Sequence, residues 1–265
     1  MSAMTDATVT GAGTSEAVRV TFFIPCLNEE RHVCDVLEKL TEVAKRLSLG
    51  HEILVVDDAS TDRTVEKVQA WRRAHPDAPV RLLVNRVNQG LARNFVEGAF
   101  RGRGEHYRMV CGDDTEPLDT HFEILKRIGE ADMILPDYSG ATGRVGGRAL
   151  VSRGYTAVVN LISGNDINYY NGCALLRRED VLRWHVEATG FGFQAELLTR
   201  LFVEGRSYVE LTLPAIHHGE SRAVTFRNVV SVLYSLAKIA ARRLSHWLNP
   251  GRTQSKAALY EMPPP

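Results

Sequence analysis

The sequence lacks a membrane-spanning stretch, because no run of about 18 residues is free of charged side chains. Residues 226–248 come nearest, but Arg227, Lys238, Arg242 and Arg243 interrupt them. An excess of charge is also absent, since 32 Lys and Arg balance 32 Asp and Glu. Nucleic-acid-binding proteins usually carry a basic excess, so we expect no nucleic-acid partner.

Cysteine is scarce, and none of the four residues forms a Cys-x-x-Cys pair. This pattern favours neither a zinc knuckle nor a disulfide framework, and it fits a reducing cytoplasm. Residues 1–17 are small and polar and lack the apolar core of a signal peptide. Residues 249–265 hold four prolines. We therefore expect a disordered N-terminal tail and a flexible C-terminal tail.

Two common nucleotide-binding motifs are missing: Gly-x-Gly-x-x-Gly does not follow the first predicted strand, and no P-loop is present. The composition is that of an ordinary globular protein, with 44% hydrophobic and 24% charged residues. A chain of 265 residues is long enough for one large α/β domain.

The first half of the chain alternates strand and helix patterns. Strands are predicted at residues 18–24, 52–56, 80–84 and 107–110, and helices at 29–47, 63–74 and 91–101. Later strands are predicted at 173–176 and 208–213, whereas residues 136–172 are glycine-rich and predicted to be mostly loop. Such alternation indicates a mostly parallel sheet, in which ligands bind beyond the carboxyl ends of the strands.

The loops after the first four strands carry an unusual number of polar and acidic side chains. Their sequences are PCLNEE, DDASTD, NRVNQG and GDDTEP, beginning at Pro25, Asp57, Asn85 and Gly112. One carboxylate after a strand can simply cap the next helix, which is an equal alternative for Asp62. Three acidic residues within four, at 113–116, exceed what a cap needs. They favour a hard divalent ion such as Mg²⁺ or Mn²⁺.

Five segments occur in an order that resembles family-2 glycosyltransferases of the GT-A fold, and within them the dolichyl- and polyprenyl-phosphate branch. These segments are FFIPCLNEE, EILVVDDASTDRT, NQGLARNFVEGAF, MVCGDDTEP and GFGFQAELL, and the resemblance extends from about Val18 to Arg222. It implies a Rossmann-like GT-A domain over residues 18–222, with a mostly parallel central sheet and helices on both faces. An amphipathic helix at 223–248 is expected to follow.

The resemblance implies roles for residues of the first two loops and of the glycine-rich segment. Residues that would line the nucleotide-sugar are Pro25, Leu27, Asn28, Glu29, Asp57, Asp58, Asp113 and Arg148. Among them, Asp58 is favoured for contact with the base. Arg148 belongs to a cationic wall for phosphates, for which a solvated loop is the alternative.

The fourth loop corresponds to the family's Asp-x-Asp element, with Gly112 at the position of the first Asp. The resemblance implies that Asp114 and Glu116 hold Mg²⁺ or Mn²⁺, with Asp113 replacing the lost ligand. Asp114 would thereby belong to the catalytic centre.

On the acceptor side, Gln194 occupies the place where relatives that act on hydroxyl groups have a catalytic Asp. A glutamine cannot act as a general base, whereas a phosphate acceptor needs none, so the motif favours a lipid phosphate. Simple polar packing is the alternative for Gln194. Glu196 remains a nearby candidate base, and Arg222 matches a basic residue near the donor diphosphate.

The predicted function is metal-dependent, inverting transfer of a hexose from a GDP- or UDP-sugar to a polyprenyl-phosphate-type acceptor. Helix 226–248 packs on the core or on a second copy, or lies peripherally on anionic lipid, which would locate the protein at the inner face of the cytoplasmic membrane. Two other functions stay open: transfer to a glycan or other hydroxyl, and non-catalytic binding of a nucleotide-sugar, which the loss of Asp at Gly112 permits.

Overall fold

The computed structural model describes residues 17–140, 147–183, 190, 192–216 and 226–248. The strands are β1 (Val20–Cys26), β2 (His51–Asp57), β3 (Val80–Val84), β4 (His106–Met109), β5 (Met133–Asp137), β6 (Leu175–Arg177) and β7 (Tyr208–Thr212). The helices are α1 (Val33–Arg46), α2 (Thr64–Ala74), α3 (Leu91–Arg101), α4 (Leu118–Leu125), α5 (Gly147–Ser163), α6 (Arg178–Leu182), α7 (Phe193–Val203) and α8 (Phe226–Leu248).

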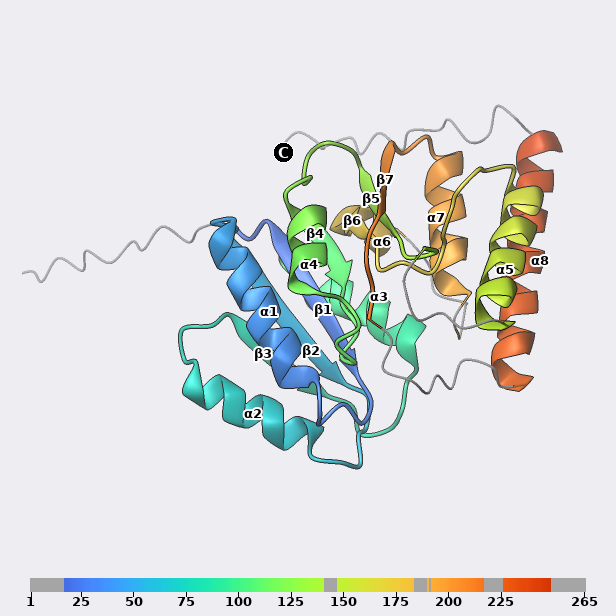
Figure 1. The fold of residues 1–265 in the computed structure, drawn as a ribbon. Coiled ribbons are helices and arrows are strands. Elements are labelled where there is room, and N and C mark those ends of the chain that lie inside the picture. Colours follow the sequence, from blue (N-terminus) through green and yellow to red (C-terminus); the bar gives the residue numbers. More distant parts are fainter. Residues whose placement is uncertain (1–16, 141–146, 184–189, 191, 217–225, 249–265) are drawn as a thin grey trace, which may run out of the picture.

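One sheet of seven strands organises the described residues, in the order β3-β2-β1-β4-β6-β5-β7. Strand β6 pairs antiparallel with both β4 and β5, and all the other neighbours pair parallel. The mostly parallel α/β fold predicted from the sequence is confirmed. Because six strands share a direction, their carboxyl ends and the loops that follow them lie along one edge of the sheet (Figure 1).

Alternating side chains of the strands form two cores, one on each face of the sheet. On one face, Phe22 and Ile24 of β1 pack with Val36 and Leu40 of α1, and α2 and α4 complete this layer. On the other face, Phe23 packs against α3, with α6 and α7 alongside. This period of two buries every position of β1 except Pro25, as expected for a strand covered on both sides.

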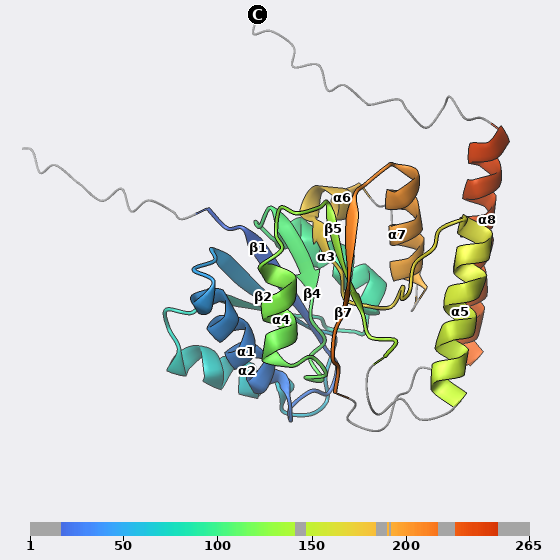
Figure 2. The same ribbon diagram turned by 45° about the horizontal axis from the view of Figure 1, so that its top comes forward.

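Helices α5 and α8 pack side by side and form a further layer outside α7 (Figures 1 and 2). The C-terminal helix is confirmed, whereas the prediction that residues 136–172 are mostly loop is wrong over Gly147–Ser163. Glycine and β-branched residues have low helix propensity, which weakened the signal in α5. Its outer face is also apolar, so the usual alternation of apolar and polar residues is missing.

Candidate active site

Backbone and side-chain hydrogen bonds join the loops after β1 and β2. The Asn28 N–H donates to Ser60 Oγ at 2.9 Å, and Asn28 Oδ1 accepts from the Thr61 N–H at 2.8 Å. Next to them, the Glu30 N–H donates to Asp62, which also accepts from the N–H of Thr64, the first residue of α2. The two loops therefore form one unit at the carboxyl edge of the sheet.

Asp58 connects this unit to the loop before α3. Its carboxylate accepts hydrogen bonds from Asn85 Nδ2 and from the N–H groups of Gln89 and Gly90, at 2.7–2.9 Å. Burial alone would raise the pKa of Asp58, but these donors outweigh burial and lower it. By contrast, Asp57 accepts from the Ser60 N–H through one oxygen, while its buried Oδ1 has no partner among the described residues. Asp57 therefore keeps an acceptor for a ligand, whereas Asp58 organises the loops.

Left-handed backbone conformations mark three of these loops. Asn28, Ala59 and Asp114 have φ values of 62°, 65° and 57°. Asparagine tolerates this region, but it costs an L-residue such as alanine about 1–2 kcal/mol. Strained backbone of this kind clusters at functional sites.

The acidic loop after β4 approaches the loop after β1 closely at Gly112. A Cβ at this position would lie 3.1 Å from Cys26 Sγ and from the Pro25 carbonyl oxygen, and 3.2 Å from Glu29 Cγ. A side chain fits here only if its neighbours shift. Glycine at the first Asp-x-Asp position therefore allows the two loops to meet and brings Glu29 toward Asp113.

Glu29 and Asp113 repel each other across this contact. Burial, together with the charges of Asp113 and Asp62, raises the pKa of Glu29 from 4.5 to about 7. Burial also raises the pKa of Asp113, although Thr115 Oγ1 donates to its carboxylate at 3.2 Å. Adjacent carboxylates whose ionisation is unfavourable provide the oxygen ligands that a divalent cation prefers.

We expect Glu29→Gln to raise the melting temperature more at pH 8 than at pH 5. Because the folded-state pKa of Glu29 lies above the unfolded value, its contribution to stability is complete below about pH 4.5 and is lost as pH rises toward 7. Without metal, the gain at pH 8 should exceed the gain at pH 5 by about 2–4 °C. Equal gains at both pH values, measured by thermal unfolding, would contradict the assigned pKa.

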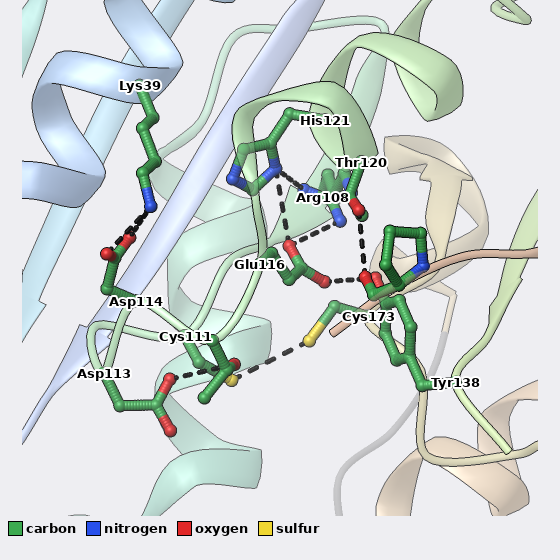
Figure 3. A network of polar contacts seen from close by, with 12 residues as sticks. Lys39, Arg108, Cys111, Asp113, Asp114, Glu116, Thr120, His121, Tyr138 and Cys173 are labelled. Carbon is green, nitrogen blue, oxygen red and sulfur yellow. Dashed lines mark hydrogen bonds and ion pairs between the residues drawn. The ribbon is translucent and has the colours of Figure 1, made fainter. Parts of the chain in front are cut away.

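The three predicted metal ligands Asp113, Asp114 and Glu116 have separate partners (Figure 3). Both oxygens of Asp114 accept from Lys39 Nζ at 2.8 Å, and Glu116 accepts from Arg108 Nη2 at 2.7 Å. Within the described part of the chain, no group of three or more His, Cys, Asp or Glu side chains is arranged to hold a metal. Asp113 has no cationic partner of this kind among these contacts, and the negative charges of Asp113 and Glu29 and of Asp113 and Glu116 act on one another.

The acceptor motif lies at the beginning of α7. Gln194 has a buried Oε1, for which the described part of the chain supplies no hydrogen-bond partner. Glu196 is buried and ion-paired with Lys238 at 2.7 Å and with Arg242 at 3.5 Å, both from α8. These contacts connect α7 to α8. They also pair the Glu196 carboxylate, the candidate base of the sequence analysis, with two cations.

The side chains of two predicted site residues, Arg148 and Arg222, are not described by the structure. Arg222 lies outside the described residues, and Arg148 is assigned to the first turn of α5 by its backbone only. The predicted lining residues Pro25 and Leu27 do lie at the carboxyl edge, where Pro25 is the sixth residue of β1 and Leu27 follows this strand with 46% exposure.

Sequence reasoning missed four side chains that hold the acidic loop: Lys39, Arg108, His121 and Tyr138. The sequence did contain one sign of these contacts, because Arg108 is a charged residue within a strand that is otherwise expected to be buried. A buried arginine requires a carboxylate partner. Lys39 and Tyr138 come from distant segments, and only the fold brings them to this loop.

A surface hollow of about 730 Å³ lies at the opposite edge of the sheet, near His51 and Pro79. It borders the amino ends of β2 and β3, whereas the linked loops and the acidic residues lie at the carboxyl ends. In open parallel sheets ligands bind at the carboxyl ends, so we assign the candidate active site there.

Comparison with known proteins identifies the family of the chain. Residues 21–183, more than half of the chain, match the family described as glycosyl transferase family 2. The chain belongs to this family. The match includes the three linked loops and the acidic loop after β4, so the resemblance seen in the sequence motifs is confirmed.

Curated relatives include enzymes named for lipid phosphates. A dolichyl-phosphate beta-glucosyltransferase of Trichomonas vaginalis is 31% identical over 116 residues, which cover 42% of this chain and 34% of the relative. An undecaprenyl-phosphate 4-deoxy-4-formamido-L-arabinose transferase of Salmonella choleraesuis is 24% identical over 231 residues, covering 82% and 66%. The chain thus spans between a third and two thirds of the length of these relatives.

Among solved structures, glucosyl-3-phosphoglycerate synthase of Mycobacterium tuberculosis, crystallised with Mg²⁺ and uridine diphosphate, superposes with a TM-score of 0.66. It is 18% identical, and the alignment covers 84% of this chain and 80% of the synthase. At this identity the likeness supports the GT-A-like fold alone. Among the described helices, none combines the length and the apolar character needed to cross a bilayer.

Proposed function

We propose that this chain transfers a hexose from a nucleotide-sugar, GDP- or UDP-linked, to a polyprenyl-phosphate-type lipid at the membrane surface. Family membership supports glycosyl transfer, and the names of the relatives support a lipid-phosphate acceptor. The observation that carries the proposal beyond these similarities is the outer surface of α5 and α8.

That surface, called here the α5/α8 face, is unusually apolar. Nine of the fifteen large hydrophobic side chains exposed among the described residues belong to these two helices. Those of α5 are Leu150, Val151, Val158 and Leu161, and those of α8 are Leu233, Tyr234, Leu244, Trp247 and Leu248. Exposed apolar surface gathered in one region marks an interaction site with protein or membrane.

Charge on the same helices favours an anionic membrane as the occupant. Neither helix contains Asp or Glu, whereas together they carry six basic residues: Arg148, Arg153, Arg227, Lys238, Arg242 and Arg243. The whole chain has a formal net charge of zero, so the excess of positive charge is confined to these helices and is balanced elsewhere in the chain. Three of the six already contact the protein, because Lys238 and Arg242 pair with Glu196 of α7 and Arg243 donates to the Ser163 carbonyl oxygen. Two helices without carboxylates offer a second copy no opposite charge, whereas anionic head groups attract the arginines of α5. Because the cysteines are free, we propose contact at the inner face of the cytoplasmic membrane.

The acceptor motif also favours a phosphate. A hydroxyl acceptor must lose a proton to a base, and in this segment Gln194 is an amide while Glu196 is ion-paired with two cations. A lipid phosphate is already ionised at neutral pH. Its oxygen can form the bond to the anomeric carbon while the bond to the donor diphosphate breaks, so the sugar inverts and a nucleoside diphosphate leaves.

On the donor side, Asp113 and Glu29 fit a divalent cation, because both carboxylates are partly buried and both have raised pKa values. A bound Mg²⁺ or Mn²⁺ would neutralise charge that develops on the departing diphosphate. Asp57 would accept a hydrogen bond from the nucleoside through Oδ1, and Asp58 holds the loops that surround it. Asp114 keeps the acidic loop against α1 through Lys39.

A matched pair of acceptors tests this proposal. Purified protein receives GDP-mannose or UDP-glucose with Mn²⁺, and anionic vesicles that contain either a polyprenyl phosphate or the same polyprenol without phosphate. We expect transfer to the phosphate alone and unaltered acceptor choice in Glu196→Gln. Transfer to the free hydroxyl that is lost in Glu196→Gln would establish a hydroxyl-acceptor enzyme. Absence of transfer and of donor hydrolysis, despite nucleotide binding, would establish the non-catalytic alternative.

A further inference from the structure

Arg108 of β4 is a fully buried cation at the inner end of the acidic loop. Its side chain has no solvent exposure, and Nη2 donates to Glu116 Oε2 at 2.7 Å. Burial lowers the pKa of His121 to about 3, so this histidine is neutral and its Nδ1 accepts from Arg108 Nη1 at 2.9 Å. The pKa of Glu116 is lowered, because Arg108 and its other partners outweigh burial. A buried charge of this kind is tolerated only when its partners are fixed.

The other oxygen of Glu116 extends this contact to a different part of the sheet. Glu116 Oε1 accepts a hydrogen bond from the hydroxyl of Tyr138, which directly follows β5 (Figure 3). Burial raises the pKa of Tyr138, so the hydroxyl keeps its proton as a donor. Strands β4 and β5 are not neighbours, because β6 lies between them and runs in the opposite direction. The carboxylate of Glu116 therefore links two strand ends that the sheet itself does not join.

Two further contacts connect this loop, and helix α4 that follows it, to the segment after β7. The N–H of Ile216 donates to the Thr115 carbonyl oxygen at 2.8 Å, and Thr120 Oγ1 donates to the Pro214 carbonyl oxygen at 3.0 Å. The acidic loop is thus bonded on one side to Lys39 through Asp114, and on the other side to Tyr138 and Ile216, which follow β5 and β7. Asp113 directly precedes the three loop residues, Asp114, Thr115 and Glu116, that make these contacts.

We propose that Arg108, Glu116 and Tyr138 form a positioning unit that fixes Asp113 and the donor side of the site relative to the segment that follows β5. This inference rests on the proposed function and assigns Glu116 a role other than metal ligand. Both Glu116 oxygens are occupied by protein donors, so the residue acts through the placement of the loop. A displacement of about 1 Å between reacting groups can reduce the rate by about 100-fold.

The test is a double-mutant cycle with Tyr138→Phe and Glu116→Gln, and with Tyr155→Phe as the matched control. The hydroxyl of Tyr155 is also buried, but it has no hydrogen-bond partner within the segments that the structure describes. Tyr138→Phe removes one hydroxyl and keeps the ring, so it should fold even if Glu116→Gln, which leaves Arg108 unpaired, melts about 5–10 °C lower. We expect each variant to reduce kcat about tenfold, the double variant to lose no more than Glu116→Gln, and the control to match the wild type.

The concentration of Mn²⁺ that gives half-maximal activity separates this role from metal binding. We expect it to stay within about twofold of the wild-type value in Tyr138→Phe and in Glu116→Gln. A tenfold increase in Glu116→Gln, with Tyr138→Phe fully active, would overturn the proposal in favour of a metal ligand. Additive losses would also overturn it. A wild-type protein that transfers no sugar refutes the proposed function, whereas an active wild type without coupling refutes this inference alone.

Discussion

Asp113→Asn is expected to reduce sugar transfer by about 10²–10³-fold and to remove the stimulation by Mn²⁺. The reason is the position of the Asp113 carboxylate, because burial and then the negative charge of Asp113 raise the pKa of Glu29. Replacing a charged oxygen by an amide removes a ligand but nearly preserves the shape of the side chain. The measurement is kcat/KM for the donor over a series of Mn²⁺ concentrations.

Two controls distinguish this effect from general damage to the loop. Asp119→Asn alters an exposed carboxylate in the first turn of α4 and should behave like the wild type. Asp114→Asn breaks the ion pair with Lys39, so we expect a lower melting temperature and a smaller loss of transfer, with unchanged dependence on Mn²⁺. If Asp114→Asn abolishes the response to Mn²⁺ while Asp113→Asn retains it, the ligand assignment is reversed.

The double variant Leu161→Glu with Leu244→Glu is expected to lose binding to anionic vesicles by about 100-fold or more. These leucines are 84% and 56% exposed on the α5/α8 face. Transfer of a leucine side chain into an apolar environment contributes about 1.5–3 kcal/mol, or roughly a factor of ten or more for each residue. An added carboxylate is also repelled by anionic head groups. Vesicle flotation measures the bound fraction.

Phe100→Glu is the matched control for this variant. Phe100 is 64% exposed at the end of α3, a helix that does not contribute to the α5/α8 face, so its replacement should leave flotation unchanged. Increasing salt should weaken wild-type binding, because the basic residues of α5 and α8 contribute through screened attraction. If the double glutamate variant floats as well as the wild type, the α5/α8 face does not bind membrane.

The sequence predicted those features that depend on local pattern. The strand Val80–Val84 and the helix Leu91–Arg101 have the predicted bounds, because β-branched runs and helical spacing are local signals. The gathering of the polar and acidic loops on one edge of the sheet could also be predicted, since parallel strands place their following loops there. Helix α5 escaped prediction because its exposed face is apolar, and patterns based on amphipathicity assume water on that side.

The roles of adjacent carboxylates could not be read from the sequence. Asp113 and Asp114 are neighbours, but the left-handed backbone at Asp114, with φ of 57°, turns its side chain to Lys39. Glu116 meets Arg108 and Tyr138 only after β4 and β5 have taken their places in the sheet. Sequence spacing limits which groups can meet, whereas the fold decides which of them pair.

The identity and configuration of the lipid product test the central claim most directly. Wild-type protein, Mn²⁺ and an α-linked nucleotide-hexose are incubated with anionic vesicles containing polyprenyl phosphate, and the extracted lipid is analysed by mass spectrometry and NMR. We expect a polyprenyl phosphate that has gained one hexose in β linkage, and no such lipid with Asp113→Asn. Recovery of the hexose on a soluble hydroxyl compound, with the lipid unmodified, would contradict the account.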